Sequence, residues 1–313
     1  MLTNDFMLFS GTSHVKFAED IAKSIGVTLG HIRIDRFPDG EIGVQILENV
    51  RGRDVFVIQT VAKDPNLYLM ELLILIDALK RASAHRIIAV IPYYGYARQD
   101  RKDKGRVPIT AKLIANLLVT AGVTRVVTMD LHAEQVQGFF DIPVDNLYAR
   151  PVLIEGIKAL KAENPTIVTP DIGSVKLARI LADEIHADFA IVDKRRTSSS
   201  DVKVNAIIGD VQGRDVILVD DICSTGSTLK SAALACKKAG ARHVYGALTH
   251  ALLTKDALLG SGIEKLLVTD TVPLSDEVDR SLVEVISVAG LFGNVIQSIV
   301  NNQSVSAFFR SRT

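Results

Sequence analysis

The sequence predicts an α/β protein of two domains, each a mostly parallel β-sheet flanked by helices. Short β-branched runs alternate with helical stretches from one end of the chain to the other. The 313 residues exceed one ordinary compact core and suit two domains of roughly 150 residues each. A short sequence also recurs in the two halves of the chain.

The predicted elements follow from apolar runs and from longer periodic stretches. Short apolar runs bounded by turn residues are typical of buried parallel strands. The predicted strands are Val55–Gln59, Arg86–Ile91, Arg125–Met129, Thr166–Thr169, Phe189–Val192, Val216–Val219, His243–Ala247 and Lys265–Thr269. The predicted helices are His14–Ser24, Leu67–Ala82, Ile109–Thr120, Ser174–Glu184 and Thr228–Ala239. The polar run Thr197–Ser200 is predicted to be a loop.

The recurring sequence indicates an internal duplication. VRGRDVFVIQ (Val50–Gln59) and VQGRDVILVD (Val211–Asp220) share V-x-G-R-D-V before an apolar strand, and a helix and another strand follow each. Chance is the alternative, because Gly, a basic residue and Asp commonly begin a strand. The repeat favours two duplicated domains, at residues 1–149 and 150–303. Residues 304–313 are expected to form a tail that packs on the N-terminal domain.

Composition argues against several functional classes. Lys plus Arg and Asp plus Glu number 36 each, a neutral balance that argues against a nucleic-acid-binding protein. Cys223 and Cys236 have the spacing of neither a disulfide framework nor a zinc site. The N-terminus lacks a secretory signal, and the most apolar helix, Leu67–Leu79, carries Glu71 and Asp77 and is too short to span a membrane. We therefore expect a cytoplasmic protein that binds neither nucleic acid nor membrane.

The most informative motif is VILVDDICSTGSTL, Val216–Leu229. An apolar strand is followed by two acids, Asp220 and Asp221, and by small residues that open a helix. Small residues let successive backbone N–H groups point at one spot, and the helix N-terminus adds its positive end. A Ser- and Thr-rich helix cap without a ligand is the simpler alternative. Two adjacent acids at a strand exit favour a phosphate cradle, with the acids beside it for sugar hydroxyls or Mg²⁺.

A second motif, Tyr93–Leu118, follows a predicted strand and is rich in cations. These cations are Arg98, Arg101, Lys102, Lys104 and Arg106. A solvated charged loop is the alternative for such a run. Gly95 and Gly105 flank the cations and could serve as hinges, which suits a loop that closes over a polyphosphate. Because the chain has no GxxxxGK[ST] sequence, a nucleotide would be held in some other way than by a P-loop.

These motifs resemble the ribose-phosphate pyrophosphokinase family. Val216–Leu229 is similar to the phosphoribosyl-binding loop of the type I phosphoribosyltransferase fold, which pyrophosphokinases share with true transferases. The segments that resemble the pyrophosphokinases themselves, in the family's order, are Arg36–Thr60, Tyr93–Leu118, Asp130–Ala149, Thr169–Ala178 and Val192–Arg196. The resemblance covers nearly the whole chain and implies two duplicated type I phosphoribosyltransferase-like domains.

The resemblance implies a ribose-phosphate diphosphokinase, which transfers the β,γ-diphosphoryl group of MgATP to the 1-hydroxyl of D-ribose 5-phosphate. The products would be 5-phospho-α-D-ribose 1-diphosphate and AMP, and catalysis would consist mainly of positioning and electrostatic stabilisation. It further implies Mg²⁺ as cofactor and a homohexamer built from dimers with shared active sites. The alternatives are a phosphoribosyltransferase that uses the diphosphate and a non-catalytic regulatory homologue.

The resemblance also implies which residues form the site. ATP would be bound by Phe37, Asp39, Gly40, Glu41, Arg98, Gln99 and Asp100, with Phe37, Asp39 and Glu41 contacting the adenine from a neighbouring subunit. The catalytic pair would be Lys194 and Arg196, and the Mg²⁺ ligands His132 and Asp171. Ribose 5-phosphate would be bound by Arg196, Asp220, Asp221, Ser224, Thr225, Gly226, Ser227 and Thr228. Without the resemblance, each of these residues has a simpler interpretation. Phe37 could pack in a core, His132 could be a structural histidine, and Lys194–Arg196 could lie in a solvated loop.

The chain departs from the family at several of these positions. Ser224 stands where many members have Asp, and Ser174 and Ser227 stand where many have Gly. The last two add a Cβ where a positive φ could be required. Asn302–Phe309 resembles the family's C-terminal segment near an allosteric site, whereas Asn49 stands where a phosphate-contacting Ser is frequent. The resemblance thus leaves regulation by ADP and phosphate open.

Overall fold

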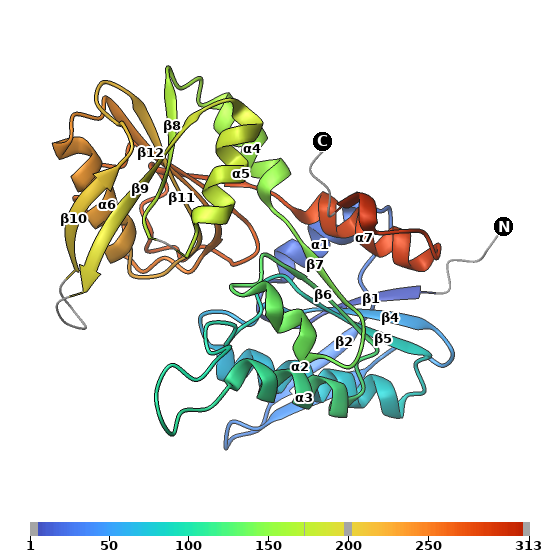
Figure 1. Ribbon diagram of the computed structural model, residues 1–313. Helices are drawn as coiled ribbons and strands as arrows, with labels where there is room; N and C mark the ends of the chain where they lie inside the picture. Colours follow the sequence, from blue (N-terminus) through green and yellow to red (C-terminus); the bar gives the residue numbers. More distant parts are fainter. Residues whose placement is uncertain (1–5, 172, 197–201, 309–313) are drawn as a thin grey trace. The chain divides into compact units, whose positions relative to one another are not determined.

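The computed structural model describes residues 6–171, 173–196 and 202–308 (Figure 1). The chain divides into two compact units. The first unit comprises Met1–Tyr148 and Val288–Thr313, and the second comprises Ala149–Ser287. In the described residues no helix is both long and apolar enough to span a membrane.

The first unit contains a parallel five-stranded sheet in the order β1-β4-β5-β6-β7. Its strands are β1 (Phe6–Ser10), β4 (Asp54–Ile58), β5 (Arg86–Ile91), β6 (Arg125–Met129) and β7 (Val144–Leu147). Helices α2 (Pro65–Arg81) and α3 (Thr110–Ala121) cover one face, and α1 (Val15–Ser24) and α7 (Ala289–Val300) cover the other (Figure 1). The remaining helical turns are η1 (Glu134–Phe139) and η2 (Ser306–Phe308).

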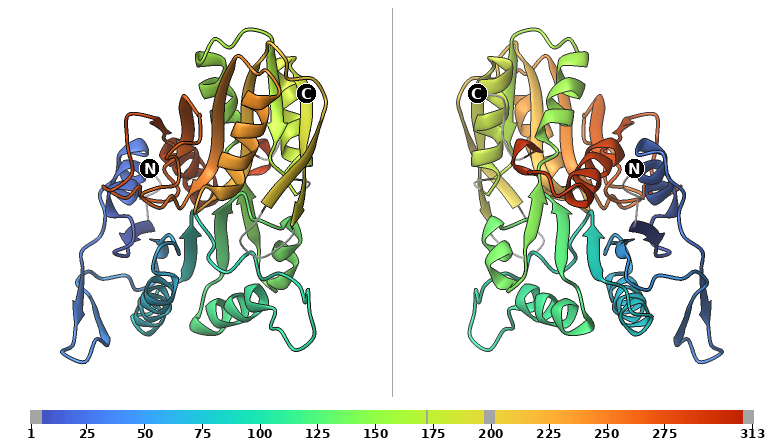
Figure 2. Two further views of the ribbon diagram at one scale, coloured as in Figure 1. Left: turned by 90° about the vertical axis from the view of Figure 1, so that its left-hand side faces the viewer. Right: turned by 90° about the vertical axis from the view of Figure 1, so that its right-hand side faces the viewer.

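An antiparallel hairpin of β2 (Ile32–Arg36) and β3 (Ile42–Ile46) forms a separate arm of the first unit (Figure 2). Partly buried apolar residues of both strands pack against the core cluster that contains Leu72 and Leu75 of α2. The tip of the hairpin carries no such residue, and Phe37 there is 58% exposed. The arm is thus anchored through its strands and leaves its turn in solvent.

The second unit contains a seven-stranded sheet in the order β10-β9-β8-β11-β12-β13-β14, parallel except for the pair β9–β10. Its strands are β8 (Pro165–Thr169), β9 (Asp188–Arg196), β10 (Val202–Ile208), β11 (Asp215–Cys223), β12 (His243–Ala251), β13 (Lys265–Thr269) and β14 (Val283–Ile286). Helices α4 (Arg150–Ala159) and α5 (Val175–Ile185) cover one face and α6 (Ser227–Lys238) the other (Figure 1). Central strands are apolar on both faces because both are covered.

The repeated sequence has the same backbone geometry in both units. Gly52 and Gly213 have φ values of 73° and 69°, a left-handed conformation that glycine adopts without strain. The N–H of Gly52 donates to the carbonyl oxygen of Ser83 at 2.9 Å, and that of Gly213 donates to Gly240 at 2.8 Å. The repeat predicted from the sequence is therefore confirmed at this position.

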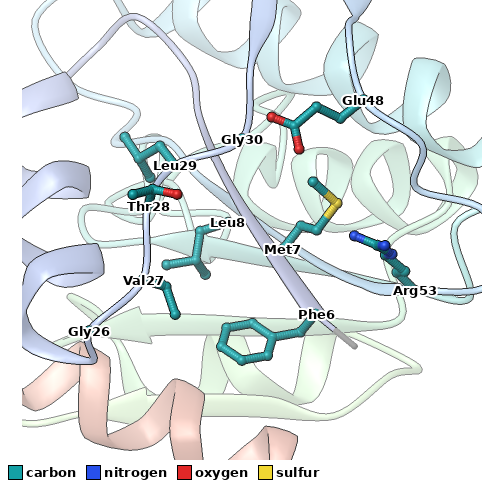
Figure 3. A pocket seen from close by; sticks show the side chains of 10 residues that line it. All are labelled: Phe6, Met7, Leu8, Gly26, Val27, Thr28, Leu29, Gly30, Glu48 and Arg53. Atoms are coloured by element: carbon teal, nitrogen blue, oxygen red, sulfur yellow. The ribbon is translucent and has the colours of Figure 1, made fainter. Parts of the chain in front are cut away.

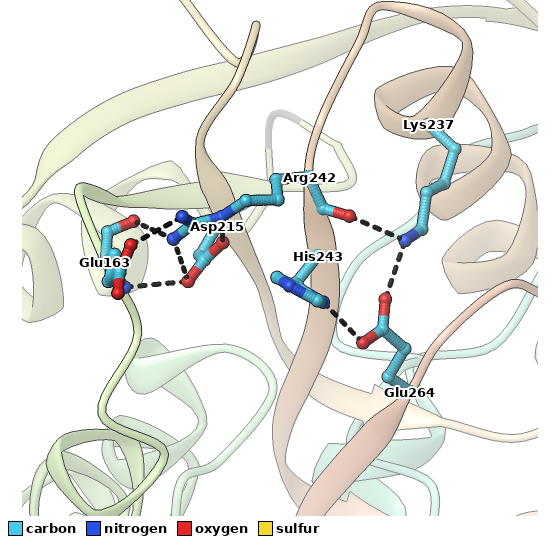
Figure 4. Close-up of polar contacts among 6 residues, drawn as sticks. All are labelled: Glu163, Asp215, Lys237, Arg242, His243 and Glu264. Carbon is cyan, nitrogen blue, oxygen red and sulfur yellow. Dashed lines mark hydrogen bonds and ion pairs between the residues drawn. The ribbon is translucent and has the colours of Figure 1, made fainter.

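Two residues after each of these glycines, an aspartate binds an arginine that lies at the start of the next strand or immediately before it. Asp54 accepts a hydrogen bond from Arg86 Nε at 2.9 Å. In the second unit Asp215 accepts from Arg242 Nε at 2.7 Å and from the Glu163 N–H at 2.7 Å (Figure 4). These ion pairs lie at the amino ends of the strands, away from the loops that follow the carboxyl ends.

The segment that forms helix α7 does not belong to the domain to which the sequence analysis assigned it. We expected residues up to 303 to belong to the C-terminal domain, but α7 belongs to the first unit. Phe292 of α7 packs edge-on against Phe17 of α1, with ring centroids 5.6 Å apart. Gly293 lies against Ser24, where a Cβ would come within 2.2 Å of the serine Oγ. The close approach of the two helices explains the difference.

Every predicted strand and helix is present, with changes at the ends. The elements that the sequence analysis missed are β1, β2, β3, β7, β10, β14, α4 and α7. Four of these strands, β1, β7, β10 and β14, lie at sheet edges, and β2 and β3 form the exposed arm. Polar residues or glycine interrupt the apolar residues of β2, β3, β7, β10 and β14, which is typical of strands that are not covered on both faces, whereas β1 begins with four consecutive apolar residues. The predicted loop Thr197–Ser200 lies outside the described residues.

Candidate active site

The second sheet has a topological switch point between β8 and β11. The chain passes from β8 to β9 on one side, whereas β11 and β12 lie on the other side of β8. Ligands of open α/β sheets bind at the carboxyl ends of strands at such a point. Asp171 follows β8 closely, and Asp220 and Asp221 lie near the end of β11. The fold therefore brings three of the predicted residues together.

Asp220 and Asp221 lie on the part of β11 that extends beyond its neighbour β8. Pairing with β8 ends before the acids, while pairing with β12 continues to Cys223, so the strand is longer than predicted. Burial, the charge of Asp221 and the charge of Asp171 together raise the pKa of Asp220 to about 8. An acid that is buried among like charges is typical of a ligand site.

Residues Ser224–Gly226 join β11 to α6, and Ser227 and Thr228 are the first residues of that helix. Gly226 has a φ of 74°, and a Cβ at this residue would lie 2.0 Å from the carbonyl oxygen of Ala257. Only glycine fits this position. Gly226 is also the N-cap of α6 and has no side chain to bind the first N–H groups of the helix. An anion could therefore bind there, beside the hydroxyls of Thr225 and Ser227, which lie 3.2 Å apart.

The two serines that replace glycines do not strain the backbone. Ser174 has a φ of −97°, and Ser227 is the first residue of helix α6. The concern that a positive φ is required at these positions was therefore wrong. Ser224, the third departure, holds the loop through its carbonyl oxygen, which accepts from the Thr254 N–H at 3.1 Å.

Ser174 instead contacts the predicted ribose-binding acid. Its Oγ is buried with the rest of the residue and donates to Asp220 Oδ1 at 2.5 Å. The Asp221 N–H donates to the same oxygen at 3.0 Å. Asp171 Oδ1 accepts from the Gly173 N–H at 2.8 Å. The sequence analysis missed the contact of Ser174, because no local pattern links two residues that lie 46 positions apart.

Lys194 and Arg196, the predicted catalytic pair, lie at the end of β9. Their backbones pair with β10, Lys194 opposite Val204 and Arg196 opposite Val202. Their side chains lie outside the described residues. The structure thus places this pair on the strand beside β8, and no contact of the two side chains is described.

The predicted adenine-binding residues form the turn of the β2–β3 hairpin. The Phe37 N–H donates to Glu41 O at 2.9 Å, and the Gly40 N–H donates to Phe37 O at 2.9 Å. Asp39 Oδ1 accepts from the Glu41 N–H at 3.2 Å, and Gly40 has a φ of 95°. These bonds fix the turn and leave the Phe37 ring exposed, which excludes the core-packing alternative within the described chain.

The cationic segment, the motif Tyr93–Leu118, contains a loop whose two ends are joined by hydrogen bonds, and we call this the cationic loop. The carbonyl oxygen of Gln99 accepts from the Ala111 N–H at 3.1 Å, and Thr110 Oγ1 donates to Gln99 Oε1. Asp100 Oδ2 accepts from Gln135 Nε2 at 2.8 Å. Arg98 is exposed just before Gln99. The hydrogen bonds of Gln99 therefore join the two ends of the loop at the start of α3.

His132, the other predicted metal ligand, is exposed after β6 and belongs to the first unit, whereas Asp171 belongs to the second. Across the ranges that the structure describes, no three His, Cys, Asp or Glu side chains converge on a metal position. Mg²⁺ commonly uses one or two carboxylates together with substrate phosphates, so such a cluster is not required.

A cavity of about 440 Å³ lies elsewhere in the first unit (Figure 3). It is lined by the first residues of β1, Phe6–Leu8, by the loop Gly26–Gly30, and by Glu48 and Arg53. None of these residues is a predicted site residue. They lie near the start of β1 and not at the carboxyl ends of the strands, so the cavity is not the candidate active site.

Comparison with known proteins assigns the chain to a family. A model of the N-terminal domain of ribose phosphate pyrophosphokinase matches residues 6–122, and a model of the phosphoribosyl synthetase-associated domain matches residues 197–310. The chain is similar to ribose-phosphate pyrophosphokinases of Neisseria meningitidis (47% identity over 98% of this chain and 95% of the relative) and Wolinella succinogenes (50% identity over 97% and 99%).

The fold agrees with this assignment. The crystal structure of phosphoribosylpyrophosphate synthetase from Mycobacterium smegmatis superposes with a TM-score of 0.90 at 40% identity, and covers 95% of this chain and 99% of that chain. The match extends over nearly the whole length of both chains. The chain therefore belongs to the ribose-phosphate pyrophosphokinase family.

Proposed function

We propose that the protein is a ribose-phosphate diphosphokinase, which transfers the diphosphoryl group of ATP to the 1-hydroxyl of ribose 5-phosphate. The observation that carries the proposal is the cradle at the start of α6 beside a pair of acids, in a chain that matches the family over its full length. The products are phosphoribosyl diphosphate and AMP.

Ribose 5-phosphate binds in the second unit. The phosphate accepts hydrogen bonds from the loop Ser224–Thr228 and from the first N–H groups of α6. Asp220 and Asp221 accept hydrogen bonds from ribose hydroxyls. Gly226 supports this role, because its conformation lets the loop backbone curl close to Ala257.

ATP binds through the loop that contains Arg98, Gln99 and Asp100. Arg98 neutralises phosphate charge. Lys194 and Arg196 stabilise the charge of the migrating diphosphoryl group, and Arg196 also contacts ribose 5-phosphate. The exposed Phe37 contacts adenine in a neighbouring subunit of a homo-oligomer, with Asp39, Gly40 and Glu41 beside it.

The site suits Mg²⁺ as the cofactor, bound together with ATP. The support is the donor chemistry of the second unit, where hard oxygen ligands lie together and where burial and the charges of Asp221 and Asp171 raise the pKa of Asp220. Asp171 and His132 are the residues that would hold the ion or its waters. When bound, Mg²⁺ would neutralise phosphate charge.

A shared active site has a direct test. The Phe37→Ala and Asp220→Asn variants should each have strongly reduced activity alone at substrate concentrations below the wild-type KM values, and mixing them should restore part of the activity because one site in a mixed assembly has both residues intact. AMP formation after mixing the two proteins measures this. No recovery from a mixture that has exchanged subunits would place Phe37 and Asp220 in the site of one chain.

The function itself is tested by measuring AMP and ADP formation from MgATP, with and without ribose 5-phosphate. We expect AMP that depends on ribose 5-phosphate, without ADP, because the β-phosphorus is attacked. ADP in place of AMP would indicate transfer of a single phosphoryl group. No product from a folded sample over a range of Mg²⁺ and phosphate concentrations would refute the proposed activity.

A further inference from the structure

A buried carboxylate in the first unit holds two strand-end loops together. Glu71 of α2 is 1% exposed. Its Oε1 accepts from the Thr12 N–H at 2.6 Å and from Gln59 Nε2 at 2.8 Å, and its Oε2 accepts from Thr12 Oγ1 at 2.6 Å. Thr12 follows β1 and Gln59 follows β4, so a single side chain ties the carboxyl ends of adjacent strands.

The network continues from these loops to a third one. Gln59 Oε1 accepts from the N–H and Oγ of Ser13, at 3.1 and 2.6 Å. Ser13 Oγ accepts from the Thr60 N–H at 2.9 Å, and Thr60 Oγ1 accepts from the Tyr93 N–H at 3.1 Å. The Val61 N–H donates to Tyr93 O at 3.0 Å. Hydrogen bonds thus connect Glu71 with the first residue of the cationic segment.

The backbone at this point is tightly packed. A Cβ at Gly95 would lie 2.6 Å from the carbonyl oxygen of Val61, so the start of the cationic segment rests directly on the β4 loop. A shift of Val61 would therefore move the residues that lead to Arg98. The position of Arg98 therefore depends on the loop after β4, which contains Val61.

Stability alone gives little reason for an acid at position 71. A buried carboxylate costs free energy, and none of its hydrogen-bond donors among the described residues is a cation. Its neighbours Leu72 and Leu75 are fully buried, so a leucine would suit this face of α2. A connected set of hydrogen bonds instead fixes the positions of the groups it joins.

The internal repeat supports a role at the active site. In the alignment of the two repeats, Gln59 and Thr60 correspond to Asp220 and Asp221. In the second unit these positions carry the acids assigned to ribose 5-phosphate. In the first unit Gln59 and Thr60 bond to protein groups, and through them to Glu71. The same strand end holds a ligand in one unit and a loop in the other.

We propose that Glu71 is a positioning residue for ATP: it holds the loops after β1 and β4 and thereby fixes the base of the cationic loop that carries Arg98. Glu71 does not touch the nucleotide. The proposal rests on the proposed function in one respect, the assignment of the cationic loop to ATP.

The test compares Glu71→Leu with Glu71→Gln. Leucine has a similar size but accepts no hydrogen bond, so the Kd and KM for MgATP should rise about tenfold, while the KM for ribose 5-phosphate stays within about twofold of wild type. Glutamine keeps Oε1, and its amide can donate to Thr12 Oγ1, so it should restore ATP affinity to within about twofold. Calorimetry measures binding, and the AMP assay measures both KM values.

A second pair of variants covers the case in which Glu71→Leu does not fold. Thr60→Val keeps the shape and removes the acceptor of the Tyr93 N–H, so it should weaken MgATP binding about threefold, whereas Thr60→Ser should not. Asp77→Asn is the matched control, because Asp77 lies on the same helix with its side chain half exposed and binds only Arg81 among the described residues. It should change neither constant.

The proposal is overturned if Glu71→Leu or Thr60→Val lowers the Tm but leaves MgATP affinity at the wild-type value. An equal rise in both KM values would also overturn it, since a general loss of structure affects both substrates. Wild-type protein that binds MgATP but forms no AMP would refute the proposed reaction instead. The comparison of Kd values would then still decide the role of Glu71.

Discussion

The two strand-to-helix junctions of the repeat differ in how their helices begin. In the first unit Asp64 caps α2, its side chain accepting from the Leu67 N–H at 3.2 Å, and Pro65 has no N–H to offer. In the second unit the cap of α6 is Gly226, which has no side chain. The first junction binds its own protein groups, and the second can bind an anion. One strand-turn-helix frame thus serves as scaffold in one unit and as binding site in the other.

The loops that follow β1 and β8, the sheet neighbours of β4 and β11, show the same contrast. Ser13 Oγ donates to Gln59 Oε1 at 2.6 Å, and Ser174 Oγ donates to Asp220 Oδ1 at 2.5 Å. In both units a serine that follows one strand orients the side chain at the carboxyl end of the neighbouring strand in the sheet. The difference is that Gln59 also bonds to Glu71, whereas Asp220 lies beside two further acids. A ligand with donor hydroxyls fits the second arrangement.

The largest expected effect comes from a substitution that blocks the junction between β11 and α6, called the open junction because no side chain caps its helix; the junction between β4 and α2, capped by Asp64, is the closed one. Gly226→Ala places a Cβ 2.0 Å from Ala257 O at a φ of 74°, so the loop must move and the cradle is lost. We expect the KM for ribose 5-phosphate to rise about 100-fold or more, as for the loss of several hydrogen bonds to a charged group, with the Kd for MgATP unchanged. The AMP assay and calorimetry measure these constants.

Gly213→Ala is the control for this substitution. Gly213 has a similar φ of 69° and belongs to the same unit, but a Cβ there meets no atom within 4 Å. It should cost about 1 kcal/mol of stability and leave the KM for ribose 5-phosphate unchanged. If both alanines raise this KM equally, backbone strain and not closure of the cradle is responsible.

Asp220→Asn should change both ribose binding and the pH dependence of stability. Burial and the charge of Asp221 raise the pKa of Asp220 to about 8 in the folded protein. For such an acid the stabilising contribution is full below the unfolded pKa of about 4 and is lost as the pH rises through the folded pKa. Wild-type protein without ligands should therefore lose stability relative to Asp220→Asn between about pH 4 and 8, by up to about 1.4 kcal/mol per pH unit.

Chemical denaturation of both proteins at several pH values within that range measures the difference. The KM of Asp220→Asn for ribose 5-phosphate should rise about tenfold, because an amide accepts hydrogen bonds from hydroxyls less strongly than a carboxylate does. Parallel stability curves for the two proteins would show that Asp220 does not titrate in this range.

Local sequence was sufficient to predict the open junction but not the closed one. Val216–Leu229 contains the strand, the acids and the small residues in one continuous stretch, so each part could be read from its neighbours. The closed junction depends on Glu71 and Thr12, which lie 59 positions apart and meet only through the fold. The repeat alone offered a signal, since it aligns Gln59 with Asp220. The residues of α7 were assigned to the wrong domain for the same reason, because their partner α1 is near the other end of the chain.

A smaller effect is expected from the serine that orients Asp220. Ser174→Ala removes one donor to a buried carboxylate, so the KM for ribose 5-phosphate should rise about threefold to tenfold near pH 7. The Ser174 hydrogen bond lowers the pKa of Asp220, so it favours the ionised acid. The rise in KM should therefore be smaller at higher pH, where Asp220 ionises even without this hydrogen bond. Ser174→Thr should retain most of the affinity.

Ser261→Ala is the matched control, since Ser261 is also buried in the second unit and its Oγ accepts from the Ile263 N–H at 3.2 Å. It should lower the Tm without changing the KM for ribose 5-phosphate. An unchanged KM in Ser174→Ala at every pH would show that Asp220 is held by its backbone alone.

The smallest effect on activity is expected where the two units are most alike, at the ion pairs Asp54–Arg86 and Asp215–Arg242. Asp215 is 4% exposed and Asp54 17%, while both arginines reach solvent. Asp215→Ala should therefore cost about 2 kcal/mol of unfolding free energy and Asp54→Ala about 1 kcal/mol, with KM values unchanged in both.

The pH dependence of these two variants checks the cause. Burial alone would raise the pKa of Asp215, but hydrogen bonds from Arg242 and from the Glu163 N–H outweigh it and hold the pKa below its usual value. The stability it contributes is present above the unfolded pKa of about 3.9 and is lost as the pH falls through the lower folded pKa. The gap between wild type and Asp215→Ala should therefore narrow below about pH 4. If the difference in unfolding free energy between wild type and Asp215→Ala stays constant into acid, the loss is due to packing and not to charge. The amino ends of these strands would then differ from the carboxyl ends, where the charge of Asp220 governs the pH dependence.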